Sequence, residues 1–301
     1  MSFRDAILSF VMRRVIQRHF KPQVNVAGLR KFDSWPKVGR TVKGCRVEEY
    51  VSVSGARAAC LVPKKQELSS DIVLYLPGGA YVSGPSLAQW TLTSQLAVAS
   101  GRKVILLDYA KAPEHCFPVA MEQVVAELGA LRTAHPEASI VVAGDSAGAG
   151  LALGTTLWLR DNQEPLPDAV ILVSPLLDVE LRDPAIAAMA YEDPMLSPEG
   201  VTGAAQLYAP GQTSSPYVSP LHGSFEGLPS IQLLIGTRDI FLPDCRTLKH
   251  RLEAAGSSLS YHEYPGMFHV WQALDRLVPE AAHSIQAMAT FLKNVSKPVG
   301  E

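Results

Sequence analysis

Charged residues are scarce in this chain, at 19 % of its 301 positions, and they nearly balance, leaving a formal net charge of −2. Proteins that bind nucleic acid or attach electrostatically to anionic membranes need a clustered excess of Lys and Arg. The composition therefore predicts no nucleic-acid partner. Hydrophobic residues make up 47 % of the chain, which is enough for a large buried core and excludes wholesale disorder.

Cysteine is scarcer still, with four scattered residues at Cys45, Cys60, Cys116 and Cys245. They form no Cys-x-x-Cys pair and no metal-ligand spacing with histidine, so the sequence predicts neither a disulfide framework nor a metal site. Buried free thiols in a reducing compartment are the simplest account of this usage, and they favour a cytoplasmic location.

Long hydrophobic runs are missing as well. No stretch approaches the roughly 20 apolar residues of a membrane span, and residues 6–12 are too short an apolar run, bracketed by arginines, for a signal peptide. We therefore expect no stable membrane insertion. Near the N-terminus, apolar residues at roughly helical spacing predict an amphipathic helix that packs on the rest of the protein, with a peripheral membrane contact as the alternative. These residues are Phe3, Ile7, Phe10, Val11 and Ile16.

One pentapeptide carries the strongest functional signal. Gly144-Asp145-Ser146-Ala147-Gly148 follows the β-branched apolar run 139–143 and precedes the helix-compatible stretch 149–159. A Gly-x-Ser-x-Gly sequence between a strand and a helix is typical of a nucleophile elbow, whose strained turn requires small neighbours. The context favours Ser146 as a nucleophile over an ordinary glycine-rich helix start. It also leaves the backbone N–H of Ala147 at a helix start, where it can stabilise an oxyanion.

From about residue 70 onward, strand-like and helix-like runs alternate. The strand-like runs are 72–76, 103–109, 139–143, 169–174, 231–236 and 258–264. The helix-like runs between and after them are 86–100, 117–134, 149–159, 241–255 and about 270–294. Apolar strands separated by helices indicate an α/β fold with a mostly parallel sheet that helices cover on both faces.

Two regions depart from this rhythm. Residues 46–53 and 56–62 are typical of an antiparallel edge hairpin, and a proline-rich stretch after residue 177 has only short helix-like pieces near 185–190 and 198–208. An insertion of this size after a strand is typical of a functional segment. We expect an N-terminal segment, 1–45, and a cap insertion, 178–228, to form a helical cap over the carboxyl edge of the sheet. The core domain is then 46–301.

A serine nucleophile needs a base that takes its proton and a carboxylate that orients the base. In α/β hydrolases these partners follow the serine in the order acid, then histidine, each on a loop after a strand. Asp239 and His269 follow the last two strand-like runs in this order, which predicts a Ser146–Asp239–His269 triad. Asp244 is the alternative acid, but its place inside a helix directs it elsewhere. The other seven histidines lie on or near helices, inside a strand, in the insertion or in a loop that carries a different motif.

An oxyanion hole needs further backbone N–H groups near the acyl oxygen. The segment Leu76-Pro77-Gly78-Gly79-Ala80-Tyr81 follows the first buried strand, where a glycine turn lets the backbone approach a substrate. An ordinary Gly-Gly turn is the alternative interpretation of this segment.

Taken together, the chain resembles the hormone-sensitive lipase family of α/β-hydrolase esterases, also called bacterial family IV. Five segments within roughly 70–295 carry the resemblance in order: Pro77–Ala80, Asp108–Pro118, Gly144–Gly148, Thr237–Asp239 and Gly266–His269. The resemblance implies an α/β-hydrolase fold with a helical cap and carboxylesterase or lipase-like activity on short or medium acyl esters, without a cofactor. It implies oxyanion donors among Gly78, Gly79, Ala80 and Ala147, and it suggests a homodimer.

Two positions depart from the family pattern. Pro77 stands where the family usually has His, and Ala80 stands where it has a third glycine. The N–H groups of Gly79 and Ala80 remain, so an oxyanion hole can still form, but Pro77 cannot supply the side-chain hydrogen bonds of a histidine. The departures bear on the geometry of this loop and on substrate preference more than on the type of reaction. The segment Asp108–Pro118 is expected to brace the loop.

The sequence thus predicts a serine carboxylesterase that acts on a small-molecule ester through an acyl-enzyme. A lactonase or an amidase could use the same triad, and a non-catalytic ligand-binding protein on a hydrolase scaffold is the alternative from another class. Plant gibberellin receptors resemble the family but lack the catalytic histidine, which is present here as His269. Candidate pocket residues, several of which could equally belong to the core, are Tyr81, Asp145, Leu176, Met195, Tyr208, Met267 and Phe268.

Overall fold

The computed structural model describes residues 10–19, 21, 23–35, 42–64, 69–274 and 278–295. Its strands are β1 (Cys45–Val51), β2 (Arg57–Pro63), β3 (Ile72–Leu76), β4 (Lys103–Asp108), β5 (Ile140–Asp145), β6 (Ala169–Val173), β7 (Ser230–Gly236) and β8 (Leu259–Tyr264). The α-helices are α2 (Val26–Leu29), α3 (Leu87–Ser100), α4 (Val119–Ala134), α5 (Ala147–Asp161), α6 (Ile186–Met189), α7 (Pro198–Tyr208), α8 (Leu242–Ala254) and α9 (Pro279–Val295). Short 3₁₀ helices are η1 (Gln17–His19), η2 (Arg30–Phe32), η3 (Pro220–His222) and η4 (Trp271–Leu274).

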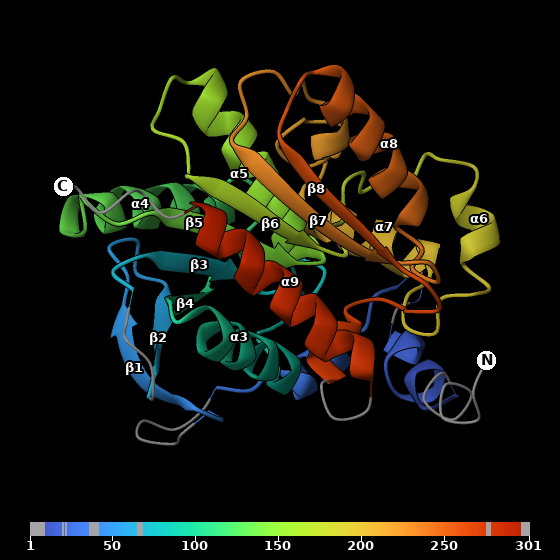
Figure 1. Ribbon diagram of the computed structural model, residues 1–301. Coiled ribbons are helices and arrows are strands. Elements are labelled where there is room, and N and C mark those ends of the chain that lie inside the picture. The colour runs from blue at the N-terminus through green and yellow to red at the C-terminus, as the bar shows by residue number, and fades with distance from the viewer. Residues whose placement is uncertain are drawn as a thin grey trace.

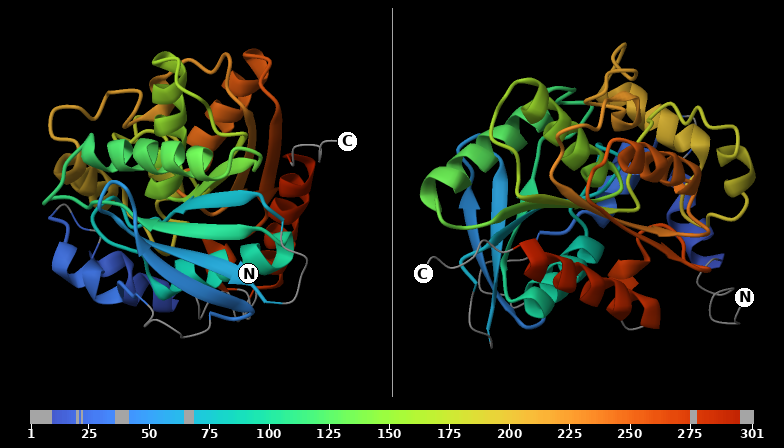
Figure 2. Two further views of the ribbon diagram at one scale, coloured as in Figure 1. Left: turned by 90° about the vertical axis from the view of Figure 1, so that its left-hand side faces the viewer. Right: turned by 45° about the horizontal axis from the view of Figure 1, so that its top comes forward.

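The strands form one twisted eight-stranded sheet in the order β1-β2-β4-β3-β5-β6-β7-β8. The six strands from β3 to β8 pair in parallel, whereas β2 is antiparallel to both β1 and β4. The predicted edge hairpin is therefore present, and Figure 2 (left) shows it along one side of the sheet. Since parallel strands end at a shared edge, the loops after β3, β5, β7 and β8 meet there, which brings the predicted site residues together.

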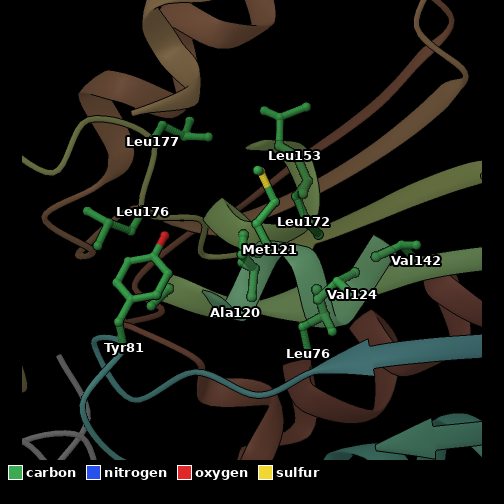
Figure 3. Close-up of a cluster of buried hydrophobic side chains, with 14 of the residues drawn as sticks. Leu76, Tyr81, Ala120, Met121, Val124, Val142, Leu153, Leu172, Leu176 and Leu177 are labelled. Atoms are coloured by element: carbon green, nitrogen blue, oxygen red, sulfur yellow. The ribbon is translucent and has the colours of Figure 1, made fainter. Parts of the chain in front are cut away.

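The parallel strands are apolar throughout because helices cover both faces of the sheet. In β3, Ile72 and Leu74 belong to one buried cluster, and Val73 and Tyr75 belong to the other. The first cluster packs under α4, α5 and α8, and the second under α3 and α9, as the two layers in Figure 1 show. Figure 3 shows part of the first cluster, with Met121 and Val124 of α4 beside the side chains of the sheet. The sequence-based prediction of an α/β fold is confirmed.

Most predicted elements agree with the structure within a few residues, but the last helix does not. The run 270–294 was expected to form one helix, and that prediction is wrong. The structure has η4 at Trp271–Leu274 and then α9, which begins at Pro279. A proline lacks the backbone N–H that would continue a preceding helix and suits the first turn of a new one.

The N-terminal segment lies beside the insertion that carries α6 and α7 (Figure 1). Residues 10–15 are helical, the Arg13 guanidinium donates to the carbonyl of Tyr191, and Gln17 Nε2 donates to the carbonyl of Leu196 at 3.0 Å. The expected buried face of this helix needs correction. Phe10 and Val11 are exposed, whereas Ile16 packs inward. Two other positions of that expectation, Phe3 and Ile7, lie outside the described residues.

Three further observations concern the described part of the chain. None of its helices has both the length and the apolar character needed to cross a membrane. Nor does it gather three or more His, Cys, Asp or Glu side chains in an arrangement that could hold a metal ion. All four cysteines are free, with Cys45 and Cys245 buried and the other two half-buried.

Candidate active site

Ser146 lies in the sharp turn between β5 and α5 with backbone angles φ 55° and ψ −123°. This positive φ is costly for a residue with a side chain and is held here by close packing on both sides. A Cβ atom added to Gly148 would lie 2.0 Å from the carbonyl oxygen of Leu76, and one added to Gly144 would lie 2.5 Å from the Gly148 backbone. The two glycines of the pentapeptide are therefore steric requirements of the turn that presents Ser146.

Ser146, His269 and Asp239 lie in one hydrogen-bonded chain. The Nε2 atom of His269 lies 2.9 Å from Ser146 Oγ, and its Nδ1 atom lies 2.9 Å from Asp239 Oδ2. Because a carboxylate only accepts, Nδ1 carries the proton of the neutral ring and Nε2 faces the serine as an acceptor. Asp239 is fully buried, and its other oxygen accepts the backbone N–H of Phe241 at 3.0 Å. The structure thus brings together three side chains from the loops after β5, β7 and β8.

The electrostatic surroundings of His269 favour its protonated form. Burial lowers the pKa of the imidazole, but the charge and hydrogen bond of Asp239, followed by the charges of Asp193 and Asp145, outweigh it. The net result is a pKa above the ordinary value for histidine. A ring with this pKa is a stronger base towards the serine hydroxyl.

The loop after β3 and the start of α5 present backbone donors beside Ser146. Among the described residues, the N–H groups of Gly79, Ala80 and Ala147 have no protein acceptor. Gly79 (φ 132°) and Ala80 (φ 53°) both have positive φ, and a Cβ atom on Gly79 would lie 2.1 Å from the Ser83 carbonyl oxygen. This turn directs the amides away from the loop's own carbonyls. The expectation for Gly78 needs correction, because its N–H already donates to Asp145 Oδ1 at 3.0 Å.

Asp145 braces this loop from beneath. One oxygen accepts from Tyr75 Oη at 2.8 Å and from the Gly78 amide, and the other accepts from Gln89 Nε2 at 2.9 Å. Burial raises the pKa of the carboxyl group, although the three donors oppose that shift. From the neighbouring β4 loop, Tyr109 Oη donates to the Pro77 carbonyl at 2.7 Å. These contacts hold the loop although Pro77 offers no polar side chain.

A cavity of about 340 Å³ opens over Ser146 and His269. Of the predicted pocket residues, Asp145, Leu176, Met195 and Phe268 line it. Many of its apolar side chains were not predicted and come from three segments: Met12, Ile16, Leu29 and Phe32 near the N-terminus, Leu196 and Val201 in the insertion, and Val270, Ala273 and Leu274 after His269. The i, i+4 spacing of Met12 and Ile16 is the sequence signal that could have indicated the first pair.

Three predicted pocket residues belong to the core instead. The rings of Tyr81 and Tyr208 stack with centroids 3.8 Å apart and planes at 3°, inside the first buried cluster. Figure 3 shows Tyr81 beside Leu176 within that cluster. Met267 packs in the second cluster, and its carbonyl accepts the Arg238 N–H at 2.9 Å. Tyr81 anchors the loop after β3 to α7, and Met267 joins the loops of Asp239 and His269.

Asp193 is a buried carboxylate beside Asp239 and His269 that the sequence analysis missed. It lies in the insertion, is fully buried, and accepts the N–H of Ile240, the residue after Asp239, at 3.1 Å. No motif surrounds it in the sequence, so only the folded arrangement of the insertion reveals it.

Asp244, the alternative acid, lies on α8 away from His269. Its Oδ2 atom has no hydrogen-bond partner among the described residues. Burial, with smaller contributions from the charges of Asp178 and Asp183, raises the pKa of Asp244 to about 7. The carboxyl group is therefore tolerated in the fold chiefly in its neutral form.

We expect Asp244→Asn to raise Tm at pH 8 by roughly 3 °C or more and to raise it by less at pH 5. Between the ordinary pKa of 3.8 and about 7 the folded state binds this proton more tightly than the unfolded state, so stability is lost as the pH rises through that window. The neutral amide avoids the buried charge. Thermal unfolding at the two pH values checks the prediction, and an equal Tm change at both would contradict it.

Comparisons with known proteins agree with this geometry. The family profile that matches residues 73–273 describes an α/β-hydrolase fold. An acetyl-hydrolase of Streptomyces hygroscopicus is 32 % identical over 250 residues, which cover 82 % of this chain and 83 % of that protein. A solved esterase from the bacterial hormone-sensitive lipase family shares 30 % identity at a TM-score of 0.85 and covers 99 % of both chains. This chain belongs to the hormone-sensitive lipase family.

As a member of that family it is a carboxylic ester hydrolase. An esterase of Acinetobacter venetianus is 31 % identical over 232 residues, which cover 76 % of each protein. The structure of EstE5 soaked with p-nitrophenyl butyrate has a TM-score of 0.87 at 26 % identity and covers 98 % of this chain and 99 % of EstE5. These relatives confirm the predicted enzyme class.

Proposed function

We propose that this esterase hydrolyses short- to medium-chain carboxylic esters through an acyl-enzyme on Ser146. The observation that carries the proposal is the pair of 2.9 Å contacts that joins Ser146 Oγ, the His269 ring and Asp239 Oδ2. In such an arrangement the buried carboxylate orients the ring and stabilises the imidazolium that forms when the serine loses its proton.

In the first half of the reaction, His269 Nε2 removes the hydroxyl proton while Ser146 Oγ bonds to the acyl carbon. The carbonyl oxygen becomes an oxyanion, which the unpaired N–H groups of Gly79, Ala80 and Ala147 stabilise. Each such donor contributes about 3 kcal/mol to lowering the barrier. The imidazolium then gives its proton to the leaving alcohol as the carbon–oxygen bond breaks, and the acyl group stays on the serine.

In the second half, His269 removes a proton from a water molecule that attacks the acyl carbon. The same donors hold the second oxyanion, and the imidazolium returns the proton to Ser146 Oγ as the acid leaves. No residue changes its net protonation over the cycle, and no cofactor takes part.

The size of the cavity supports a limited acyl length. Its volume of about 340 Å³ lies at the small end of the roughly 300–1,000 Å³ of small-molecule sites. Apolar side chains from the N-terminal segment and the insertion supply much of its wall, so we propose that segments 1–45 and 178–228 form the cap. The homodimer and the cytoplasmic location stay predictions.

A series of p-nitrophenyl esters from acetate to palmitate tests this proposal. We expect kcat/KM to be highest for butyrate or hexanoate and to fall by about tenfold or more at laurate, a difference of about 1.4 kcal/mol in the barrier. His269→Ala is the control for background hydrolysis. A maximum at palmitate would contradict the chain-length proposal, faster opening of cyclic esters would indicate a lactonase, and saturable binding without turnover would indicate a receptor.

A further inference from the structure

Asp193 connects the wall of the acyl cavity to the loop that carries Asp239. Its Oδ1 atom accepts the backbone N–H groups of Met195 and Leu196 at 2.7 Å and 3.0 Å, and both of these residues line the cavity. Its Oδ2 atom accepts the N–H of Ile240 at 3.1 Å. One fully buried side chain therefore holds together two segments of the site, the insertion and the loop that carries Asp239.

The hydrogen bonds of Asp193 suit the ionised carboxylate. All three partners are N–H donors, so a proton on either oxygen would compete with them. Burial and the neighbouring charge of Asp239 oppose ionisation and raise the pKa of Asp193, whereas His269 and the amides of Met195 and Leu196 lower it. The ionisation of Asp193 therefore depends on the charges of Asp239 and His269.

The groups that face this carboxylate come from three elements. Asp239 and His269 lie on the loops after β7 and β8, and Asp145 at the end of β5 also acts on the ring. Cys245 on α8 faces Asp239, but burial raises the pKa of its thiol far above the ordinary value and keeps it neutral.

Two further charged groups border the same segment. Arg238 donates to the Glu192 carbonyl at 3.2 Å, and its Nε atom lies 3.9 Å from that residue's carboxylate. Among the charges that raise the pKa of His269, that of Asp193 follows that of Asp239. The N-terminal segment contributes the neutral amide of Gln17, 3.5 Å from the Asp193 carbonyl. The charge of Asp193 therefore raises the pKa of His269 in addition to the charge of Asp239.

We propose that Asp193 is a positioning residue of the esterase reaction, whose ionised carboxylate holds the Ile240 amide beside Asp239 and supplies a second negative charge that favours the imidazolium form of His269. This inference rests on the triad mechanism proposed above. It makes the pH dependence of the enzyme a property of two carboxylates rather than one.

Asp193→Asn tests the proposal through the pH profile of kcat/KM for p-nitrophenyl butyrate. The amide keeps the shape of the side chain but removes the charge. His269 then loses its proton at lower pH, so we expect the acidic limb to move down by roughly half a pH unit or more. The plateau kcat should fall about tenfold, because the imidazolium of the transition state is less stabilised.

Asp178→Asn is the matched control. Asp178 is another buried carboxylate of the same region that accepts backbone amides, from Glu180 at 3.0 Å and Arg182 at 3.2 Å. Its side-chain partners are Ser219 and His222, neither of which belongs to the Ser146–His269–Asp239 chain. Its replacement should lower Tm and leave the acidic limb where it is.

The outcomes separate the two proposals. A folded Asp193→Asn protein whose acidic limb coincides with that of the wild type would overturn the positioning role, even if kcat falls. Should that variant fail to fold, Asp193→Ser removes the same charge with a smaller side chain. The position of the acidic limb of its pH profile is then compared with that of the wild type. Ser146→Ala is run alongside, since activity retained in that variant would overturn the triad mechanism itself.

Discussion

Replacement of Ser146 by alanine should lower kcat for p-nitrophenyl butyrate by about a million-fold, the loss typical when a serine nucleophile of a triad is removed. Without Oγ there is no atom to carry the acyl group, and His269 has no hydroxyl to deprotonate. The remaining donors at Gly79, Ala80 and Ala147 can still polarise a bound ester, so a small residual rate above the uncatalysed reaction is expected. Steady-state kinetics at high enzyme concentration measures this residual activity.

Ser139→Ala is the matched control for that experiment. Ser139 is a buried serine just before β5, the strand whose other end leads into Ser146, and its hydroxyl has no partner among the described residues. The same chemical change there should leave kcat within a few-fold of the wild type. Comparable losses in both variants would show that the effect of Ser146→Ala comes from the fold.

Asp239→Asn should lower kcat by about ten-thousand-fold at neutral pH. The new side-chain amide can donate an N–H to Nδ1 of His269, so the proton of the neutral ring moves to Nε2. The ring then presents an N–H to Ser146, which is the wrong tautomer for a base. The loss should shrink at high pH, where the serine proton is more easily removed by hydroxide. A pH–rate profile of the variant measures both effects.

Asp244→Asn provides the comparison for the acid, since both residues follow β7 and both are buried. We expect its kcat to equal that of the wild type, because the Asp244 carboxyl makes no contact with His269 among the described residues. If Asp244→Asn instead lost activity and Asp239→Asn kept it, the acid would have been assigned to the wrong side chain.

The arrangement of Ser146, Asp239 and His269 could be predicted from the sequence because it follows from topology. Each member comes directly after a parallel strand, and parallel strands end at one edge of the sheet, so three distant loops must meet. Ser146 had the additional signal of its two glycines, each of which the structure shows to be in contact with backbone. The sheet itself was predictable for a related reason, since strands buried on both faces are apolar throughout.

The pocket was less predictable because its walls are assembled by packing between distant segments. Tyr81 and Tyr208 stack on each other in the core, a pairing that no local pattern encodes. Met12 and Leu196 reach the cavity only because the N-terminal segment lies against the insertion. Asp193 was missed for the same reason, since its importance derives from Ile240 and Asp239, which lie far along the chain.

For the loop after β3, the sequence motif predicts where the backbone donors lie but not which residue of the loop supplies each of them. Gly78, Gly79 and Ala80 were expected to act alike, yet the Gly78 amide is occupied by Asp145 at 3.0 Å. That distinction depends on the direction of one peptide plane. Residue types alone do not determine such a direction.

The most direct test is to label the protein with diethyl p-nitrophenyl phosphate and to locate the adduct by mass spectrometry of its peptides. The account predicts one diethyl phosphate group per chain on Ser146, with release of one equivalent of p-nitrophenol and proportional loss of esterase activity. His269→Ala should react far more slowly. A stoichiometric adduct on any other residue, or full inactivation with Ser146 unmodified, would contradict the account.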